Sequence, residues 1–168
     1  MNDVEKLLAA EGIRNIKATY WFAMDTKQWD LLKTVFSKNC IVDFRGERDL
    51  KPGETYDRLP PAEKALAEGD YPVQKGPENI VKYIKEVVEH WVTVHHGAAP
   101  IITVTGPDTA KAIWPLFDYI DNGKSSLMGY GHYRETYRKE ADGVWRIETL
   151  QLTRLRMDGN HPAEFVHD

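Results

Sequence analysis

The chain has 168 residues and a formal net charge of −4. Its charges are spread along the sequence without a basic stripe, which argues against a nucleic-acid partner. No apolar run approaches the length of a membrane helix and the first residues lack a signal-peptide pattern, so we expect a soluble, cytoplasmic protein with no membrane partner. The single cysteine, Cys40, excludes an internal disulfide and a cysteine zinc site.

Apolar periodicity predicts two helices at the start of the chain, over about 4–24 and 27–36. Gly12 marks a point where the first helix could break. Polar residues at 37–39 predict a turn, and the apolar run at 40–44 predicts a strand.

A polar stretch rich in Pro and Gly, at about 46–75, predicts a long loop insertion, which could be a lid over a cavity or a disordered surface segment. Within it, PAEKALAEG could form a short helix. A third helix is expected over 77–91, and apolar stretches separated by turn signals then predict four strands, at 93–105, 109–121, 125–140 and 144–157. We therefore expect one α+β domain over 1–160, in which the helices pack on a curved, mostly antiparallel sheet, followed by a tail at 161–168.

Asp25 stands where an aromatic-rich apolar helix ends. It could cap the next helix, a common role for Asp. It could instead be delivered into an apolar cavity to orient a histidine. Tyr20 precedes it by five residues, on the helical face where a tyrosine is usually core.

His95 and His96 are the histidines best placed for chemistry, in the segment WVTVHHGAAP. Adjacent side chains of a strand point to opposite faces, so one of the two can face a cavity. The same geometry weakens a metal site, because neighbouring residues on a strand cannot easily bind one ion, and no H-E-x-x-H spacing occurs. Each could also be a hydrogen-bonded structural residue.

Further along the strands, Tyr130 and His132 share one face and could line a cavity or be half-buried surface. Arg154, in LQLTRLRM, would by itself be read as a solvated charge on the last strand. Each of these signals is weak alone.

Taken together, the helix IKATYWFAMDTKQWDLLKTVF, the VHHG segment, the TAKAIWPL strand and the Y-R-E-T-Y and DGVWRI hairpin resemble the SnoaL-like branch of the nuclear transport factor 2-like superfamily. The resemblance covers the chain except 46–75 and the tail. It is strongest to bile acid 7α-dehydratases and more distant to scytalone dehydratase and hexachlorocyclohexane dehydrochlorinase. It implies a cone of curved sheet, closed by helices around a deep pocket.

The resemblance also implies site residues. The bile acid dehydratase pattern has a Tyr and an Asp five residues apart, a His in an H-x-G segment and an Arg nine residues after the DGxW tryptophan, which here correspond to Tyr20, Asp25, His95 and Arg154. Where that family has a further pocket Tyr, this chain has Phe44. We expect the substrate to be bound by Phe44, Trp114, Tyr130, His132, Trp21 and Trp91.

The resemblance thus implies a lyase that uses no cofactor and no metal, most simply a dehydratase acting on a bulky steroid-like or aromatic hydroxylated compound. His95 would be the base, Asp25 would orient it, and Tyr20 and Arg154 would hold the substrate oxygen. A formaldehyde-releasing lyase on diaryl propanediols, a ketosteroid-type isomerase and a non-catalytic binding module stay open. A homodimer or homotrimer is expected from the family.

Overall fold

The computed structural model describes residues 1–49, 61–69 and 72–160. Its elements follow in the order α1 (Asp3–Asp25), α2 (Trp29–Thr34), β1 (Phe36–Asp49), α3 (Ala62–Ala67), β2 (Val73–Lys75), α4 (Pro77–Val88), β3 (Val92–Gly97), β4 (Ile101–Val104), β5 (Thr109–Asp121), β6 (Ser126–Lys139) and β7 (Trp145–Asn160). The α+β class expected from the sequence is confirmed.

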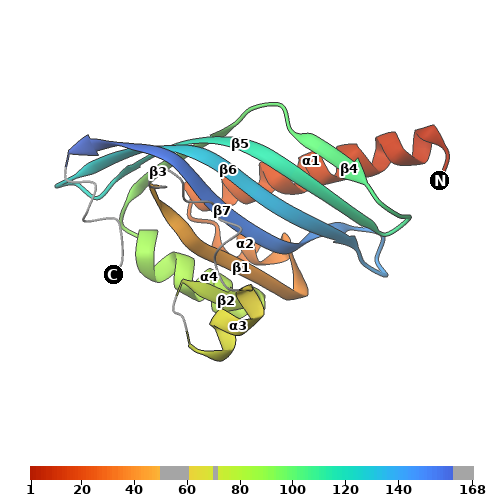
Figure 1. Cartoon of the computed structure of the whole chain (residues 1–168), viewed down its shortest axis with the longest axis horizontal. Helices are drawn as coiled ribbons and strands as arrows, with labels where there is room; N and C mark the ends of the chain where they lie inside the picture. Colours follow the sequence, from red (N-terminus) through yellow and green to blue (C-terminus); the bar gives the residue numbers. More distant parts are fainter. Residues whose placement is uncertain (50–60, 70–71, 161–168) are drawn as a thin grey trace.

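The strands form one curved sheet in the order β2-β1-β7-β6-β5-β3, and β4 also pairs with β5. The pairing of β1 with β7 is parallel and the other pairings are antiparallel. Figure 1 shows β5, β6 and β7 side by side across the molecule, with α2, α3 and α4 gathered near β1 and β2. The sheet stays open, and its inner face packs against the helices.

The first helix runs unbroken through Gly12. A capping box starts it, because the Asn2 side chain accepts from the Glu5 amide and the Glu5 carboxylate accepts from the Asn2 amide. Gly12 lies within the helix and faces the indole of Trp145. A Cβ at this position would lie 2.8 Å from Trp145 Cδ1. The glycine therefore allows close packing of α1 against the start of β7.

Other observed element boundaries differ from the predicted ones where strand pairing outweighs the local sequence pattern. The second helix is shorter than predicted, because Phe36 already pairs with Ile147 and begins β1 through the expected turn at 37–39. The stretch at 93–105 forms two strands, β3 and β4. Part of the 46–75 insertion is regular, since α3 and β2 lie in it. The lid hypothesis covers the whole insertion, of which residues 50–60 and 70–71 lie outside the described ranges. The tail at 161–168 also lies outside them.

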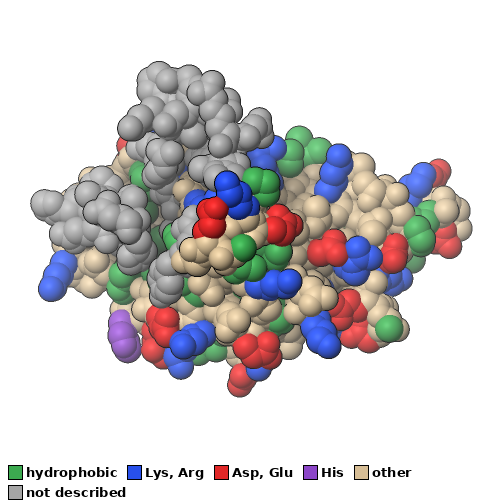
Figure 2. Space-filling view, turned by 60° about the horizontal axis from the view of Figure 1, so that its bottom comes forward, with side chains coloured by type: hydrophobic (Ala, Val, Ile, Leu, Met, Phe, Trp, Pro, Cys, Tyr) green, Lys and Arg blue, Asp and Glu red, His purple; other side chains and the backbone are tan. Residues whose placement is uncertain are grey.

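Within the part of the chain that the structure describes, no helix is both long and apolar enough to cross a membrane. On the face shown in Figure 2, acidic and basic side chains of the described residues are interspersed rather than gathered by sign.

Candidate active site

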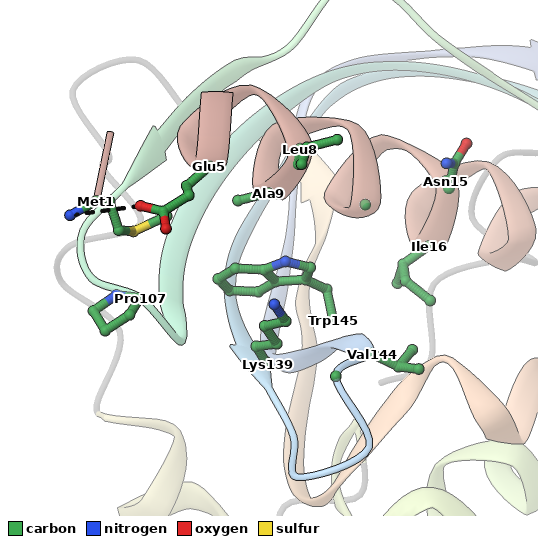
Figure 3. A pocket seen from close by; sticks show the side chains of 12 residues that line it. Met1, Glu5, Leu8, Ala9, Asn15, Ile16, Pro107, Lys139, Val144 and Trp145 are labelled. Carbon is green, nitrogen blue, oxygen red and sulfur yellow. Dashed lines mark ion pairs between the residues drawn. The ribbon is translucent and has the colours of Figure 1, made fainter. Parts of the chain in front are cut away.

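Two pockets in the described part of the molecule differ sharply in the side chains that line them. The larger, about 680 Å³, lies between the first half of α1 and the turn that joins β6 to β7, beside the indole of Trp145 (Figure 3). Its lining holds no histidine, and its drawn ion pair is an exposed contact of 3.9 Å between the Met1 amino group and Glu5. The smaller pocket is the better candidate for an active site, because several buried ionisable side chains line it.

The smaller pocket has a volume of about 60 Å³ and is bounded by α1, β1, α4 and the inner faces of β3, β5, β6 and β7. Its apolar wall consists of Met24, Phe44, Ile84, Val87, Val88, Ile120 and Leu152. Its polar lining consists of Tyr20, Tyr83, Thr93, His95, Asp118, Tyr133 and Arg154. A few polar groups converging in an apolar pocket are typical of a small-molecule site.

His95 and Asp25 contact each other at the edge of this pocket. The His95 Nδ1 atom lies 2.6 Å from Asp25 Oδ1, and the His95 amide donates to Asp25 Oδ2 at 2.8 Å. Burial acts to raise the pKa of Asp25, but hydrogen bonds from the ring and amide of His95 and from Thr93 outweigh it, so this pKa lies below its usual value. Asp25 is therefore ionised at neutral pH and can hold a proton on Nδ1, which leaves Nε2 free to accept one.

Asp118 approaches the other side of the His95 ring. The two residues are directly opposite in the register of β3 and β5, and Asp118 Oδ2 lies 4.0 Å from His95 Nε2. Both oxygens of Asp118 accept from Arg154, at 2.8 Å each. The pair is almost fully buried, with side-chain exposures of 1% and 3%. Such a bidentate pair fixes both partners in position.

Gly129 makes room for that ion pair. A Cβ at this position would lie 2.2 Å from Asp118 Oδ1 and 2.3 Å from Arg154 Nη1. Gly129→Ala should therefore displace the pair and lower the free energy of unfolding by about 1–3 kcal/mol, the usual cost of an added methyl in a packed site. Urea denaturation measures this. As a control, Met128→Ala, on the outer face of the same strand, should keep the free energy of unfolding within about 0.5 kcal/mol of wild type. An equally small change for Gly129→Ala would show that the ion pair tolerates an added methyl group.

Three tyrosines line the pocket, and two of them, Tyr20 and Tyr133, pack against each other. The rings of Tyr20 and Tyr133 meet edge to face, with centroids 5.9 Å apart, and both residues are buried. Burial, with the nearby Tyr20 and the Asp118 carboxylate, raises the pKa of Tyr133 well above its usual value, although Arg154 acts against this. The Tyr133 hydroxyl therefore stays protonated and can donate a hydrogen bond.

The structure brings most of the predicted catalytic side chains together. Tyr20, His95 and Arg154 line one pocket, and Asp25 binds His95 from outside it. Arg154 differs from expectation in its contacts, because its two terminal nitrogens bind Asp118. His96 points to the outer face, where its ring lies 6.1 Å from that of Phe117.

The predicted substrate-binding set is mostly elsewhere. Phe44 lines the pocket and stacks on Tyr83, with centroids 5.6 Å apart. Tyr130 and His132 instead lie on the outer face of β6, because in that strand the odd-numbered residues from 127 to 137 point inwards. The three predicted tryptophans also lie outside the pocket lining: Trp21 and Trp114 pack against each other in the helix–sheet layer, and Trp91 is half-buried after α4.

Sequence reasoning missed Asp118, Tyr133 and Thr93. A usable signal was present for Asp118, which continues the inward series Ala112, Trp114, Leu116 of β5. A charge in phase with buried apolar residues indicates a paired, buried group. For a metal, the described residues hold no group of three or more His, Cys, Asp or Glu side chains suited to one.

Comparisons with known proteins agree with this architecture. The sequence profile of the SnoaL-like domain family matches residues 5–151. The chain is also 25% identical over 152 residues to a Gibberella zeae protein named "Probable cyclase FGR4", which covers 88% of this chain and 91% of that protein.

Two solved structures show the same fold. Hexachlorocyclohexane dehydrochlorinase LinA-type3 from Novosphingobium barchaimii LL02 has a TM-score of 0.73 at 17% identity and covers 99% of this chain and 100% of its own. A Novosphingobium aromaticivorans protein named for scytalone dehydratase has a TM-score of 0.72 at 16% identity and covers 95% and 93%. At such identities the similarity concerns the fold alone, a cone of the nuclear transport factor 2-like type.

Proposed function

The chain belongs to the SnoaL-like domain family, and on that premise we propose that it is a cofactor-independent lyase, a dehydratase that removes water from a bulky steroid-like or aromatic hydroxylated ketone. One observation carries the proposal. His95 meets a carboxylate at Nδ1 and presents Nε2 to an apolar pocket that is also lined by three tyrosines and a buried ion pair. A binding module for a hydrophobic ligand has no need of these buried charges, which cost free energy to desolvate.

The reaction begins with His95. Its Nε2 takes a proton from the carbon next to the substrate carbonyl, and Asp25 stabilises the imidazolium that forms. Asp118, 4.0 Å from Nε2, adds a second negative charge beside the ring. The electron pair of the broken C–H bond moves towards the carbonyl oxygen, which receives hydrogen bonds from the hydroxyls of Tyr20 and Tyr133.

Elimination then completes the cycle. The enolate expels the hydroxyl group on the neighbouring carbon, and the imidazolium returns its proton to that oxygen as the C–O bond breaks. The products are an alkene conjugated with the carbonyl and one water, and His95 is again neutral. Arg154 takes part by holding Asp118 in place rather than by binding the substrate.

Binding a bulky substrate requires the pocket to widen. Its volume of about 60 Å³ has room for about two water molecules. Ile84, Val87 and Val88, on the second half of α4, form one side of it, and Val87 and Val88 are only half-buried. An outward shift of α4 is the simplest way to admit the substrate.

The test is incubation of the purified protein, without added cofactor, with hydroxylated 3-keto steroids and with diaryl propanediols, followed by mass spectrometry. Loss of one water supports the dehydratase. Loss of formaldehyde would replace it by a carbon–carbon lyase. Binding of these compounds without any chemical change would favour a binding module.

A second candidate, an intramolecular cyclase, is favoured by the name of the Gibberella zeae relative. The same base would remove the same kind of proton, and the enolate would attack a second carbonyl of the substrate instead of expelling a hydroxyl. A product of unchanged mass but altered chromatographic retention, formed from a polyketone and not from a hydroxysteroid, would support this candidate.

Asp25→Asn should lower kcat by about a hundredfold or more. An asparagine amide can donate to Nδ1, which moves the ring proton to Nε2 and removes the base. Because the pKa of Asp25 is lowered in the fold, its ionised form stabilises the protein above the usual carboxyl pKa, and this contribution is lost as the pH falls through the folded-state value. The variant should therefore be less stable than wild type at pH 7, with a difference that shrinks towards pH 3. Unaltered kcat would exclude Asp25 from catalysis.

A further inference from the structure

Lys27 occupies a backbone position that usually belongs to glycine. Its φ is +58°, in the left-handed region, and it follows Thr26, the C-cap of α1. The Gln28 amide donates to the Ala23 carbonyl and the Lys27 amide to the Met24 carbonyl, which together form a Schellman motif with Lys27 as its left-handed residue. A lysine is strained there by comparison with glycine. Strain of this kind persists where the side chain has a task.

The Lys27 side chain reaches the site through one intermediate residue. Its ammonium donates to Thr93 Oγ1 at 2.9 Å, and Thr93 Oγ1 donates to Asp25 Oδ1, also at 2.9 Å. Asp25 Oδ1 is the oxygen that contacts the His95 ring. Thr93 and His95 are two apart on β3, so both side chains face the same side of the sheet. A continuous line of hydrogen bonds thus joins Lys27, Thr93, Asp25 and His95.

We propose that Lys27 and Thr93 are positioning residues that fix the Asp25 carboxylate and thereby set the basicity of His95. The proposal rests on the proposed function for its catalytic meaning. Thr93 removes the rotational freedom of the carboxylate, whose two oxygens are then held by three donors. The ammonium of Lys27 polarises the Thr93 hydroxyl and partly offsets the negative charge that would otherwise make His95 more basic.

The direction of the effect follows from the charges that face His95. These are Asp25, Asp118, Arg154 and, through Thr93, Lys27, with the pocket tyrosines Tyr20, Tyr83 and Tyr133 as neutral neighbours. Removal of the Lys27 charge, or of the Thr93 donor, leaves Asp25 a stronger partner for an imidazolium. The protonated form of His95 then persists to higher pH.

The experiment measures that titration directly. In ¹H–¹³C NMR spectra of histidine-labelled protein, we expect the His95 titration midpoint of Lys27→Met and of Thr93→Val to lie about 0.5–1 pH unit above wild type. With an active substrate, the acid limb of the pH–kcat profile should shift by the same amount, so that kcat below the midpoint falls up to about tenfold while KM changes little. Lys124→Met, which removes an exposed lysine in the turn between β5 and β6, serves as the charge control.

Two matched substitutions separate positioning from a merely structural role. Lys27→Gly removes the same ammonium as Lys27→Met but relieves the left-handed backbone, so it should melt at a higher temperature than Lys27→Met and still give the same His95 midpoint. Thr93→Ser keeps the hydroxyl and should restore the wild-type midpoint that Thr93→Val loses. If the midpoint instead follows melting temperature, or stays at the wild-type value in both Lys27→Met and Thr93→Val, the proposal is overturned.

The NMR titration tests the positioning role of Lys27 and Thr93 independently of the proposed lyase activity. A protein that converts no substrate, yet shows the shifted midpoints, would retain the positioning role and lose the proposed function. Dehydratase activity that needs His95 but shows wild-type midpoints in both variants would retain the function and remove Lys27 and Thr93 from it.

Discussion

His95→Ala is expected to lower kcat by about 10³–10⁴-fold, the upper part of the range for loss of a positioned general base. Its backbone amide still donates to Asp25 Oδ2, so the contact between α1 and β3 survives the substitution. The free energy of unfolding should therefore fall by no more than about 1–2 kcal/mol. Steady-state kinetics and urea denaturation of the same preparation measure both quantities.

The chain itself offers the control. His96 follows directly on β3, is exposed and points to the opposite face beside Phe117. His96→Ala should keep kcat within about twofold of wild type, as expected for a surface substitution away from the site. Equal losses in the two variants would point to damage to β3 rather than to loss of a base, and near-wild-type activity of His95→Ala would end the proposed mechanism.

Local pattern predicted the elements better than the site. The 3.6-residue periodicity of α1 and α4 and the alternation in β5 and β6 are written into each segment, so their existence and type could be read from the sequence. Boundaries failed where a distant strand decided them, as at Phe36, which continues as strand because it pairs with Ile147. The family pattern predicted His95, Asp25, Tyr20 and Arg154. These residues lie on different elements, and only the fold brings them together.

What the sequence did not predict are the partners of buried charges. Asp118 binds Arg154, 36 residues further on, and Lys17 binds Glu135, 118 residues away. A charged residue in an apolar pattern shows only that it needs a partner, and the partner follows from strand register and helix placement. Gly129 illustrates the same limit, because nothing in its local sequence indicates that an ion pair lies above it.

The buried pair of Lys17 and Glu135 lies behind the pocket tyrosines. Lys17 Nζ is 2.5 Å from Glu135 Oε1, both side chains are fully buried, and the ammonium lies 3.5 Å from the Tyr133 ring centroid and 4.1 Å from that of Tyr20. The Tyr137 hydroxyl donates to the other oxygen of Glu135. Burial lowers the pKa of Lys17 to about 8, although Glu135 acts to raise it.

Lys17→Met should therefore lower the free energy of unfolding by about 3–5 kcal/mol, since it leaves the Glu135 carboxylate buried without its counter-ion. Lys17→Met with Glu135→Gln removes both charges and keeps an acceptor for Tyr137, so most of that stability should return. Urea denaturation of wild type, the two single variants and the double variant gives the coupling energy. Stability of Lys17→Met within about 1 kcal/mol of wild type would show that the pair is not desolvated.

The pH dependence provides an independent check of the same pair. With a pKa of about 8 in the fold and 10.5 as its ordinary value, Lys17 binds fewer protons in the folded chain than in the unfolded chain between these two pH values. The unfolding free energy of wild type, relative to that of the uncharged double variant, should thus rise as the pH increases from 7 to 9.5. This gain should be absent at pH values below the folded-state pKa of about 8. Cys40 contributes in the opposite direction because burial raises its pKa, and the double variant keeps this burial while removing only the smaller effect of the Glu135 charge on Cys40. A flat difference over this range would place the Lys17 pKa near its ordinary value and would mean that water reaches the pair.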